Sequence, residues 1–396
     1  MLKKCFFYTV LLGFIGASVL YCCVYVSRHY TFQEEQIKNF SIQTHWNHHT
    51  DVEEFDTCSE SWHPPDRGRK TILLWLPVSY IWSIQMSLNS CSIDNCRLTT
   101  DRRLLNQSDG VIFHFRDSHP MDRLPTCRRP EQYYVYLNFE SGIRSENNFP
   151  RKKIPRHFFN LTATYRRDSD FYEKAFGGFR FEAKEKLEIA KLDLTHYYGI
   201  NIKSKTKIAA WFVSNCKTSI NREGYVREMQ KHIPVDVFGK CLENHKSCPR
   251  KMQAKCDKML ERDYLFYLSF ENSFCPDYVT EKFYRAFETG TVPVVFGGAN
   301  YSLFAPPHSF INARDFGTPK LLADYLLKLS KNLDLYSRYF DWRGKFSLRN
   351  NPGWPCRLCK ILNDSNRISK SYEDIEDWFF NKWPCENYEW TNQTTK

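Results

Sequence analysis

Short apolar runs alternate with helical patterns along most of the chain. In the N-terminal half, the runs that predict strands span 71–76, 110–115, 133–138 and 161–165. In the C-terminal half, strands are predicted at 208–213, 235–238, 265–270, 292–296 and 309–312, and helices at 222–232, 279–289 and 320–330. Alternating strands and helices predict an α/β fold, with a parallel sheet that helices cover on both faces.

The stretch 267–296 carries the clearest pattern of this kind. Its first apolar run stops at a polar turn that begins with Glu271, and Pro276 and Asp277 then supply helix-start signals. Gly290 closes the predicted helix before the next strand. In open α/β sheets, ligands bind where strands end and helices begin, because helix N-termini attract anions. The stretch therefore predicts an anion-binding site.

The first 70 residues follow a different pattern. Residues 5–26 form an apolar run long enough to span a bilayer, and Lys3 and Lys4 precede it. The positive-inside rule then predicts a cytoplasmic tail at 1–4 and a lumenal remainder, which is the topology of a type II signal anchor. A cleaved signal peptide is the alternative. Residues 27–69 are polar and lack periodicity, so we interpret them as a stem.

A chain of 396 residues can hold two domains with their own cores. We predict an N-terminal domain at 70–200, a C-terminal domain at 201–345 and a cysteine-rich tail at 346–396 that packs back on the head. The lysine- and glutamate-rich stretch 182–192 predicts a solvated helix between the two halves.

Cysteines and glycosylation sequons point to an oxidising compartment. Of the 15 cysteines, Cys5, Cys22 and Cys23 lie in the apolar segment, which leaves an even 12 for disulfides. Six Asn-x-Ser/Thr sites lie on the lumenal side, at Asn39, Asn106, Asn160, Asn300, Asn363 and Asn392. A net charge of +11 is typical of proteins that bind nucleic acid. The predicted lumenal placement argues against that role, so we expect the basic residues to bind anionic small molecules or to keep the protein soluble.

Three charged residues near the predicted strand ends suit a sugar nucleotide. Lys282 and Arg222 could neutralise a diphosphate, and Glu281 could accept hydrogen bonds from ribose or sugar hydroxyls. The alternative is that Glu281 and Lys282 form only the solvated first turn of a helix.

Several long motifs occur in a fixed order. FYLSFENS, DYVTEK and GTVPVVFG follow one another between 266 and 297. Other motifs flank them: CRLTTDRRLLNQSD at 96–109, YLNFES at 136–141, NLTATYRRDSD at 160–170, WFVSN at 211–215 and YFDWR at 339–343. Together they resemble the α1,3-fucosyltransferases of glycosyltransferase family 10 over about 70–378. The resemblance implies a GT-B fold of two Rossmann-like domains facing a cleft, and an inverting enzyme that uses GDP-fucose without a metal or other cofactor.

The resemblance also assigns residues by position. It places donor binding in the C-terminal domain, at Ser214, Asn215, Arg222, Glu271, Asn272, Tyr278, Thr280, Glu281 and Lys282. The N-terminal domain would bind the acceptor, with Glu140 as the general base. Inversion needs a base that removes the acceptor proton, while cations and helix N–H groups stabilise the leaving diphosphate. From the residues alone, an exposed acid in a turn is the favoured interpretation of Glu140, and only the resemblance makes it the base.

Two short motifs have metal-binding alternatives. Asp168-Ser169-Asp170 has the spacing of a manganese site, but within YRRDSD the resemblance implies a structural or cleft-shaping role. Cys356 and Cys359 form a CxxC motif, which occurs in zinc sites and in redox-active sites. A zinc site would need a second pair of ligands, and no such pair stands nearby in the sequence. The resemblance pairs them with Cys91 and Cys96. We expect disulfides to cross-link the loop that contains Cys241, Cys248 and Cys256. The sequence does not assign the partner of each cysteine.

The acceptor side departs most from the family pattern. Vertebrate Lewis-type members carry two histidines before an Arg or Trp, whereas this chain has His114, Phe115 and Arg116. Arg116 favours α1,3 transfer to N-acetyllactosamine and is the candidate acceptor contact. The ending CRLCKILND is more similar to invertebrate members, some of which act on the N-glycan core, so both acceptors stay open.

These inferences predict a Golgi membrane enzyme acting on glycoprotein or glycolipid oligosaccharides. A type II membrane lectin-like receptor would share the anchor, the sequons and the disulfides. It would not need two Rossmann-like halves or a Glu/Lys pair at a helix start.

Overall fold

The computed structural model describes residues 68–76, 88–89, 91–115, 124–146, 149–150, 153–172, 179–185, 199–243, 245–350, 353–366, 369–388 and 390. The predicted membrane segment, nearly all of the predicted stem and the candidate acceptor residue Arg116 lie outside these ranges. No helix within the described ranges is long and apolar enough to cross a membrane.

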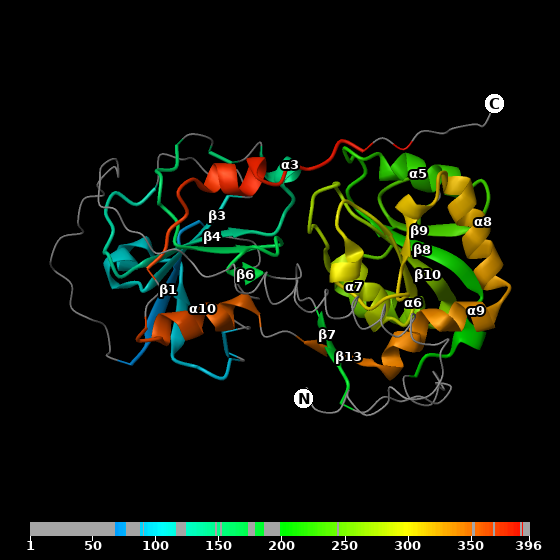
Figure 1. The fold of residues 1–396 in the computed structure, drawn as a ribbon, viewed down its shortest axis with the longest axis horizontal. Coiled ribbons are helices and arrows are strands. Elements are labelled where there is room, and N and C mark those ends of the chain that lie inside the picture. Colours follow the sequence, from blue (N-terminus) through cyan, green and yellow to red (C-terminus); the bar gives the residue numbers. More distant parts are fainter. Residues whose placement is uncertain are drawn as a thin grey trace, which may run out of the picture. The chain divides into compact units, whose positions relative to one another are not determined.

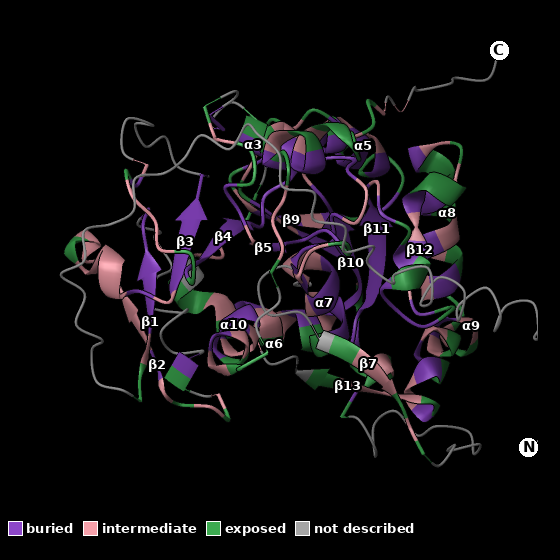
Figure 2. Cartoon of the chain, turned by 60° about the vertical axis from the view of Figure 1, so that its left-hand side comes forward, coloured by how far each residue is buried: buried purple, intermediate pink, exposed green. Residues whose placement is uncertain are grey.

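The N-terminal half forms a six-stranded sheet in the order β2-β1-β3-β4-β5-β6 (Figure 1). Its strands are β1 Lys70–Leu74, β2 Cys96–Thr99, β3 Gly110–His114, β4 Tyr133–Asn138, β5 Leu161–Thr164 and β6 Phe171–Tyr172. Every neighbouring pair is parallel. Residues of β3 and β4 are buried throughout, as expected for central strands covered on both faces (Figure 2).

The C-terminal half forms a five-stranded parallel sheet in the order β12-β11-β10-β8-β9. Its strands are β8 Lys207–Val213, β9 Val235–Gly239, β10 Tyr264–Phe270, β11 Val292–Phe296 and β12 Ile311–Asn312. The larger helices of this half are α5 Arg222–Met229, α6 Gln253–Asp263, α7 Glu281–Glu288, α8 Pro319–Ser330 and α9 Leu333–Ser337. The alternation of strand and helix along the sequence therefore predicted the five strands and helices α5, α7 and α8 of this half, but not α6.

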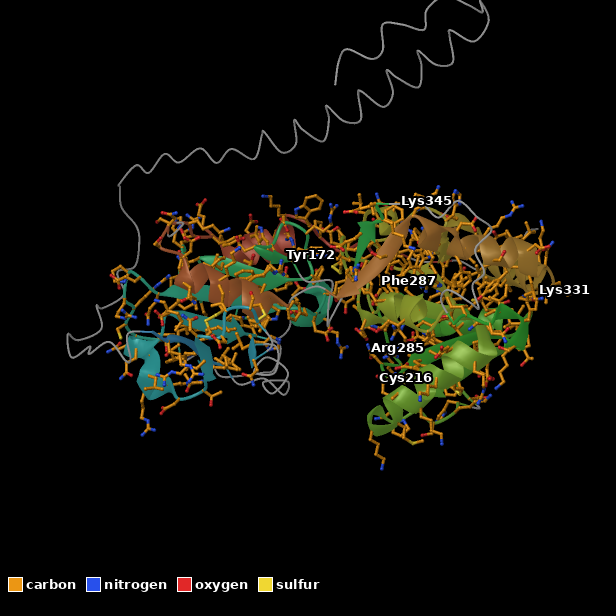
Figure 3. All side chains as sticks on the ribbon, turned by 90° about the horizontal axis from the view of Figure 1, so that it is seen from below. Tyr172, Cys216, Arg285, Phe287, Lys331 and Lys345 are labelled. Atoms are coloured by element: carbon orange, nitrogen blue, oxygen red, sulfur yellow. A yellow bond between two sulfur atoms is a disulfide. The ribbon has the colours of Figure 1, made fainter. Side chains whose placement is uncertain are left out.

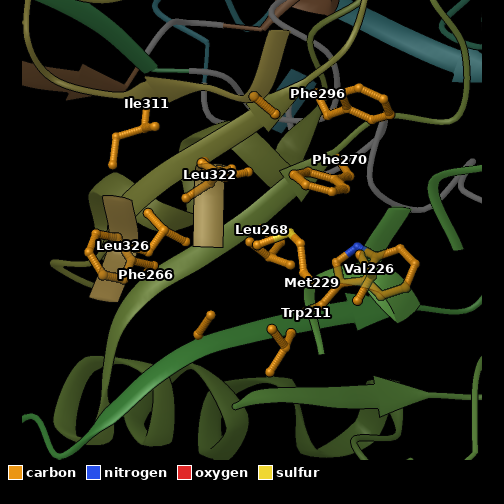
Figure 4. Packing of buried hydrophobic residues seen from close by; sticks show 14 of the residues in the cluster. Trp211, Val226, Met229, Phe266, Leu268, Phe270, Phe296, Ile311, Leu322 and Leu326 are labelled. Atoms are coloured by element: carbon orange, nitrogen blue, oxygen red, sulfur yellow. The ribbon is translucent and has the colours of Figure 1, made fainter. Parts of the chain in front are cut away.

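Helices cover both faces of the C-terminal sheet. On one face, Met229 of α5 and Leu322 of α8 pack in one cluster with Trp211 and Leu268 (Figure 4). On the other face, α6 and α7 contribute Leu260 and Ala286 to a second cluster with strand residues. The prediction that helices cover both faces of a parallel sheet is confirmed for this half. With both faces covered, ligands can reach the sheet only at the ends of its strands.

The C-terminal residues return to the N-terminal sheet. Helix α10, Trp354–Asn363, packs on one face of that sheet through Trp354 and Leu358. A short π-helical segment, Asp377–Asn381, packs on the other face through Trp378 and Phe379. Disulfides join Cys91 to Cys356 and Cys96 to Cys359, which confirms the pairing that the family resemblance implied.

The predicted helix at 182–192 is wrong in its described part. Glu182 lies in β7, Phe179–Ala183, which pairs antiparallel with β13, Phe346–Asn350. Phe181 packs against Phe287 and Trp342 with ring centroids 5.1 and 5.2 Å apart. The alternation of Phe and Ala with Arg180 and Glu182 is therefore a strand pattern, and Glu182 pairs with Arg180 on the side of the strand opposite Phe181.

Some predicted boundaries also shift. The helix expected from 279 begins at Glu281, and Asp277 before it has a left-handed φ of 60°. The helix expected to reach 232 ends at Met229, and the strand expected from 309 is only Ile311–Asn312. Gly290 does follow the end of α7, with a φ of 55° that favours glycine.

The remaining short elements and disulfides complete the described chain. The short helices are α3 Gly142–Ser145 and the 3-10 turns Arg102–Gln107, Ile202–Ser204, Arg250–Met252, Tyr301–Leu303, Ala313–Asp315 and Arg338–Gly344. Further disulfides join Cys216 to Cys241, Cys248 to Cys256 and Cys275 to Cys385, and Cys127 is disulfide-bonded as well. The predicted cross-links of the loop are thus two separate bridges.

Candidate active site

The candidate site is built on two turns, one after β4 and one after β10. The first runs from Phe139 to Ser141 and leads into α3. The second begins at Glu271 and ends at the first residue of α7. Ser141 Oγ lies 2.7 Å from Ser273 Oγ, so a buried hydrogen bond joins the two turns. The structure therefore brings together two motifs that the sequence separates by more than a hundred residues.

Glu140 lies at the point where the two turns meet. Only 8% of the residue is exposed, and its N–H donates to Asn138 Oδ1 at 2.9 Å. Tyr278 Oη, from the second turn, donates to Glu140 Oε2 at 3.4 Å, and Arg144 Nε lies 3.7 Å from the same oxygen. Both contacts are longer than a strong charge-assisted hydrogen bond, and both reach the same carboxylate oxygen.

Tyr278 connects the turn after β10 to the aromatic core of the N-terminal half. Its ring packs edge-on against Tyr165 at 5.0 Å and belongs to the same cluster as Tyr136 and Phe379. Burial and the carboxylate of Glu140 raise the pKa of Tyr278 well above its ordinary value. The hydroxyl therefore stays protonated and acts as a donor.

Glu271 forms a closed network with Thr280 and Lys282. Glu271 is fully buried, and its carboxylate accepts from Thr280 N at 2.8 Å and from Thr280 Oγ1 at 2.9 and 3.0 Å. Lys282 Nζ donates to Glu271 Oε2 at 3.2 Å and to Thr280 Oγ1 at 2.7 Å. Thr280 is also the N-cap of α7, accepting from Lys282 N. The network thus holds the start of the helix in place.

The electrostatics of this network keep Lys282 charged. Burial by itself lowers the pKa of Lys282, but the carboxylates of Glu271 and Glu281 outweigh burial and raise it above its ordinary value. Burial raises the pKa of Glu271, and the ammonium of Lys282 opposes that rise. The Lys282 side chain is 15% exposed, whereas that of Glu281 is 42% exposed. A protonated ammonium therefore reaches the surface beside an accessible carboxylate.

Arg222 is buried and ties two strand ends together. It opens α5, and its guanidinium donates to Phe270 O at 2.6 Å and to Asn215 O at 3.0 Å. Only 2% of the residue is exposed. Burial lowers the pKa of Arg222, and the carboxylates of Glu223 and Glu271 oppose that shift. The positive charge of Arg222 thus lies just beneath the carboxyl edge of the sheet.

The other predicted donor residues are more accessible. Ser214 is exposed, and Asn215 and Asn272 are partly buried. Within the described chain, the side chains of Asn215 and Asn272 make no hydrogen bond. All of the predicted donor residues follow β8 or β10, so the structure places them along one edge of one sheet, with Glu140 reaching that edge from the N-terminal half.

Sequence reasoning missed a glycine pair that lets this edge pack closely. Gly297 and Gly298 follow β11, and a Cβ on Gly298 would lie 2.5 Å from the backbone carbon of Phe274. A Cβ on Gly297 would lie 2.5 Å from the Tyr301 hydroxyl. The two glycines therefore allow the turn after β10 to lie against the neighbouring loop, and their position directly after a buried strand was the available signal.

The second missed feature is the tail at 385–390, which crosses the same turn. Cys385 is bonded to Cys275, and Glu386 N donates to Phe274 O at 2.7 Å. Tyr388 packs on Phe274 at 4.5 Å, and Trp390 Nε1 donates to the carbonyl of Asn221, the N-cap of α5, at 3.0 Å. The tail therefore fastens the two helix starts that frame the site. The lone cysteine inside the ENSFCPDY motif was the signal for it.

The Asp168-Ser169-Asp170 triplet is occupied by contacts within the chain. Asp168 forms an ion pair with Arg166 at 2.6 Å. Asp170 pairs with Lys370 and accepts from Tyr372 Oη at 2.9 Å and from Thr162 N at 2.9 Å. These contacts join β5 and its following loop to the returning C-terminal segment. Over the residues that the structure describes, no group of three or more His, Cys, Asp or Glu side chains is arranged to hold a metal ion.

The four described sequons differ in accessibility. Asn300 is exposed, and its side chain accepts only from Ser302 N at 3.3 Å. The Asn160 amide accepts from Tyr134 N and donates to Lys370 O, and the Asn363 amide bonds to Asn95 and to Cys359 O. Asn106 is partly buried. Among these four, Asn300 is the side chain best placed to carry a glycan.

Two family models match the chain. Residues 67–175 match the model described as "Fucosyltransferase, N-terminal", and residues 202–378 match "Glycosyltransferase family 10 (fucosyltransferase) C-term". The second match contains every predicted donor residue, and the first contains Glu140.

Relatives of known activity align with most of the chain. Glycoprotein 3-alpha-L-fucosyltransferase A of Drosophila melanogaster is 35% identical over 340 residues, 82% of this chain but only 63% of the relative, so less than two thirds of that protein is covered. Alpha-(1,3)-fucosyltransferase C of the same species is 35% identical over 308 residues, 74% of this chain and 70% of the relative. The human 4-galactosyl-N-acetylglucosaminide 3-alpha-L-fucosyltransferase 9 is 35% identical over 322 residues, 78% of this chain and 82% of the relative.

Solved α1,3-fucosyltransferase structures align at lower similarity. One with GDP-fucose covers 80% of this chain and 95% of that chain at 17% identity and a TM-score of 0.48, and one with GDP has a TM-score of 0.44. The ordered family matches and the relatives above 30% identity together show that the chain is an enzyme that belongs to glycosyltransferase family 10, the fucosyltransferases.

Proposed function

We propose that this protein transfers L-fucose from GDP-β-L-fucose, with inversion, to the 3-hydroxyl of GlcNAc in N-acetyllactosamine-type glycans. The observation that carries the proposal is the meeting of Glu140 with Tyr278, at 3.4 Å, beside the Glu271–Lys282 network. A base and a cationic anion site are then adjacent, which is what an inverting transfer to a hydroxyl needs.

In this proposal, the carboxyl edge of the C-terminal sheet binds the donor. Lys282 and the buried charge of Arg222 stabilise the diphosphate, together with the N-termini of α5 and α7. Glu281, Asn272, Asn215 and Ser214 are the accessible polar groups for ribose and fucose hydroxyls. Glu271, Thr280 and Tyr278 act by holding these groups in position.

In the same proposal, Glu140 removes the proton from the acceptor 3-hydroxyl. The acceptor oxygen attacks the anomeric carbon of fucose from the face opposite GDP, the carbon–oxygen bond to GDP breaks, and GDP leaves with the bonding electrons. Lys282 and Arg222 stabilise the added negative charge on the leaving diphosphate. No metal or other cofactor takes part, so we expect transfer to continue in EDTA. Loss of transfer in EDTA that manganese restores would contradict this part.

We further propose a GT-B arrangement of two Rossmann-like domains facing a cleft, with the acceptor domain at 70–200, the donor domain at 201–345 and the tail at 346–396. Residues 5–26 would anchor the head in the Golgi membrane, with the tail at 1–4 in the cytoplasm and the stem at 27–69 in the lumen. The even number of cysteines outside 5–26 supports a lumenal head.

The innermost GlcNAc of N-glycans is the second candidate acceptor. It is supported by the CRLCKILND motif, which is more similar to invertebrate members, some of which act on the N-glycan core. Arg116 and the similarity to the 4-galactosyl-N-acetylglucosaminide enzymes favour N-acetyllactosamine. Glycoproteins and glycolipids are both possible carriers of the acceptor.

The test is a transfer assay on the purified full-length chain. GDP-fucose is offered with N-acetyllactosamine or with an N-glycan core heptasaccharide, and the linkage of the product is determined by NMR. Fucose on the 3-hydroxyl of the lactosamine GlcNAc supports the first acceptor, and fucose on the core GlcNAc supports the second. Saturable glycan binding with neither transfer nor GDP-fucose hydrolysis would instead indicate a lectin-like receptor.

A further inference from the structure

A cavity lies on the C-terminal half, away from the residues proposed to bind the donor. Its volume is about 640 Å³, and its walls come from 306–308 before β12, from α8 and α9, and from the segment 338–346. Because β10, β11 and β12 are parallel, residues that precede β12 lie at the edge opposite the one where Glu271 follows β10. Figure 3 shows Lys345, which lines the cavity, and Cys216, which follows β8, on different sides of this half.

The cavity carries an excess of positive charge. Lys328, Arg338 and Lys345 line it, and Asp341 is the only acid among the lining residues. All three cations are exposed, and within the described chain none of their side chains forms an ion pair or hydrogen bond. By contrast, Lys320 on the same helix α8 pairs with Asp324 at 2.6 Å. The charge in the cavity is therefore available to an anionic ligand.

The rest of the lining is aromatic and aliphatic. Tyr325 and Tyr339 lie side by side, with their hydroxyl oxygens 2.7 Å apart. Trp342 is held between Phe181 and Phe287, at 5.2 and 5.6 Å. These rings are fixed by their neighbours before any ligand arrives, so binding costs them little conformational entropy.

Flat aromatic walls with hydroxyl groups at one side and ammonium or guanidinium groups at another suit a particular kind of ligand. Aromatic faces pack on the C–H faces of sugar rings, and their hydroxyls bond to sugar hydroxyls. Lysine and arginine bind carboxylate or sulfate groups. The cavity volume lies within the range of about 300–1,000 Å³ that is usual for small-molecule sites and has room for one or two sugar residues.

We propose that this cavity binds an acidic saccharide, a sugar that carries a carboxylate or a sulfate ester, through Lys328, Arg338 and Lys345. The site is separate from the reaction site and does not depend on the proposed transfer. Its effect would be to hold glycans with acidic ends near an enzyme whose donor site lies at the other edge of the sheet.

The experiment is ligand-observed NMR with titration on the purified full-length chain. The probes are the methyl α-glycoside of N-acetylneuraminic acid, galactose 6-sulfate, methyl β-galactoside as the neutral control, and inorganic sulfate. We expect at least one acidic sugar to bind at least tenfold more tightly than the neutral sugar, and rising salt to weaken that binding. Binding of inorganic sulfate without any acidic sugar, or equal binding of the neutral sugar, would overturn the proposal.

Variants locate the binding. Lys328→Ala combined with Arg338→Ala removes two exposed side chains, so the fold should survive, and binding of the acidic sugar should fall at least tenfold. Lys320→Ala, on the same helix outside the cavity, is the matched control and should leave binding unchanged. Fucose transfer to a small neutral acceptor should stay the same in all three proteins. Unaltered binding in the double variant, or an equal loss in Lys320→Ala, would contradict the assignment.

Discussion

The turns after β4 and β10 place a glutamate in nearly the same local setting and use it differently. In both, a Phe-Glu pair lies at the end of a buried strand, directly after β4 in one and across the last residue of β10 in the other. A serine follows closely, as Ser141 in one and Ser273 in the other. Glu271 is fully buried, and its contacts with Thr280 and Lys282 range from 2.8 to 3.2 Å. Glu140 is 8% exposed, and its contacts with Tyr278 and Arg144 are 3.4 and 3.7 Å.

The contacts of Glu271 and Glu140 differ although both residues follow a buried strand, so this position alone does not determine the role of a carboxylate. A glutamate with short bonds to a lysine and a helix N-cap stabilises structure, because a proton or a substrate hydroxyl would have to displace those bonds. Glu140 is the glutamate that we propose as the base that accepts the acceptor proton. We therefore expect substitutions at Glu140 to change chemistry and substitutions at Glu271 to change stability.

The largest expected effect is that of Glu140→Gln on turnover. If Glu140 is the base, kcat for fucose transfer should fall about 10²- to 10⁴-fold, since an amide cannot take the proton. GDP affinity and the melting temperature should stay close to those of the parent. Glu243→Gln, at an exposed position in the cysteine-rich loop, is the control. Full turnover in Glu140→Gln would remove Glu140 from the mechanism.

The next effect concerns the stability of the Glu271 network. Glu271→Ala should lower the free energy of unfolding by about 3–5 kcal/mol, because it leaves the Lys282 ammonium partly buried without its partner. Urea unfolding measures the change, and Glu140→Ala should cost much less. Equal losses for the two alanine variants would show that the turns do not differ as their contacts indicate.

A double variant separates the structural role of Lys282 from its proposed donor role. Lys282→Ala should raise the KM for GDP-fucose by tenfold or more, since a hydrogen bond to a charged group contributes about 1.5–3 kcal/mol. Combining Lys282→Met with Glu271→Gln removes both charges and should restore much of the stability that either single change loses. Donor binding should stay weak in the double variant. Recovery of donor binding along with stability would contradict contact between Lys282 and the diphosphate.

Tyr278→Phe tests the contact between the two turns. The ring should keep its packing against Tyr165, while the hydroxyl contact to Glu140 is lost. We expect a decrease of about threefold to tenfold in kcat, as for the loss of a hydrogen bond of about 1 kcal/mol, with little change in donor KM. A change confined to melting temperature would assign Tyr278 to packing alone.

The smallest expected effect is that of Ser141→Ala. It removes the buried hydrogen bond to Ser273 and should lower the free energy of unfolding by about 0.5–1.5 kcal/mol. Transfer should be nearly unchanged, because the Tyr278–Glu140 contact remains. A loss of transfer as large as that of Tyr278→Phe would mean that the serine pair, and not the tyrosine, aligns the two turns.

Local sequence was sufficient where an element is buried on both faces. Strands β4 and β11 have the predicted bounds of 133–138 and 292–296, because continuous apolar runs stop sharply at polar or glycine residues.

Helix α6 was missed, since only Cys256 and Leu260 of its residues are buried and its apolar face is narrow. Strand β7 was missed because its partner β13 lies far along the chain, and pairing, not local propensity, determines it.

The sequence by itself determined the α/β class, and its resemblance to a family gave the family membership and the partners of Cys356 and Cys359. The donor role of the residues along one sheet edge stays a prediction. The order of motifs and the periodicity of apolar residues can both be read directly from the sequence. Only the tertiary structure could show that Glu271 is closed off by Thr280 and Lys282, that Arg222 is buried beneath the strand ends, and that Cys385 fastens the tail over the turn after β10. Burial and hydrogen bonding depend on residues brought together from distant parts of the chain, so the two similar Phe-Glu sequences do not by themselves reveal the different surroundings of Glu140 and Glu271.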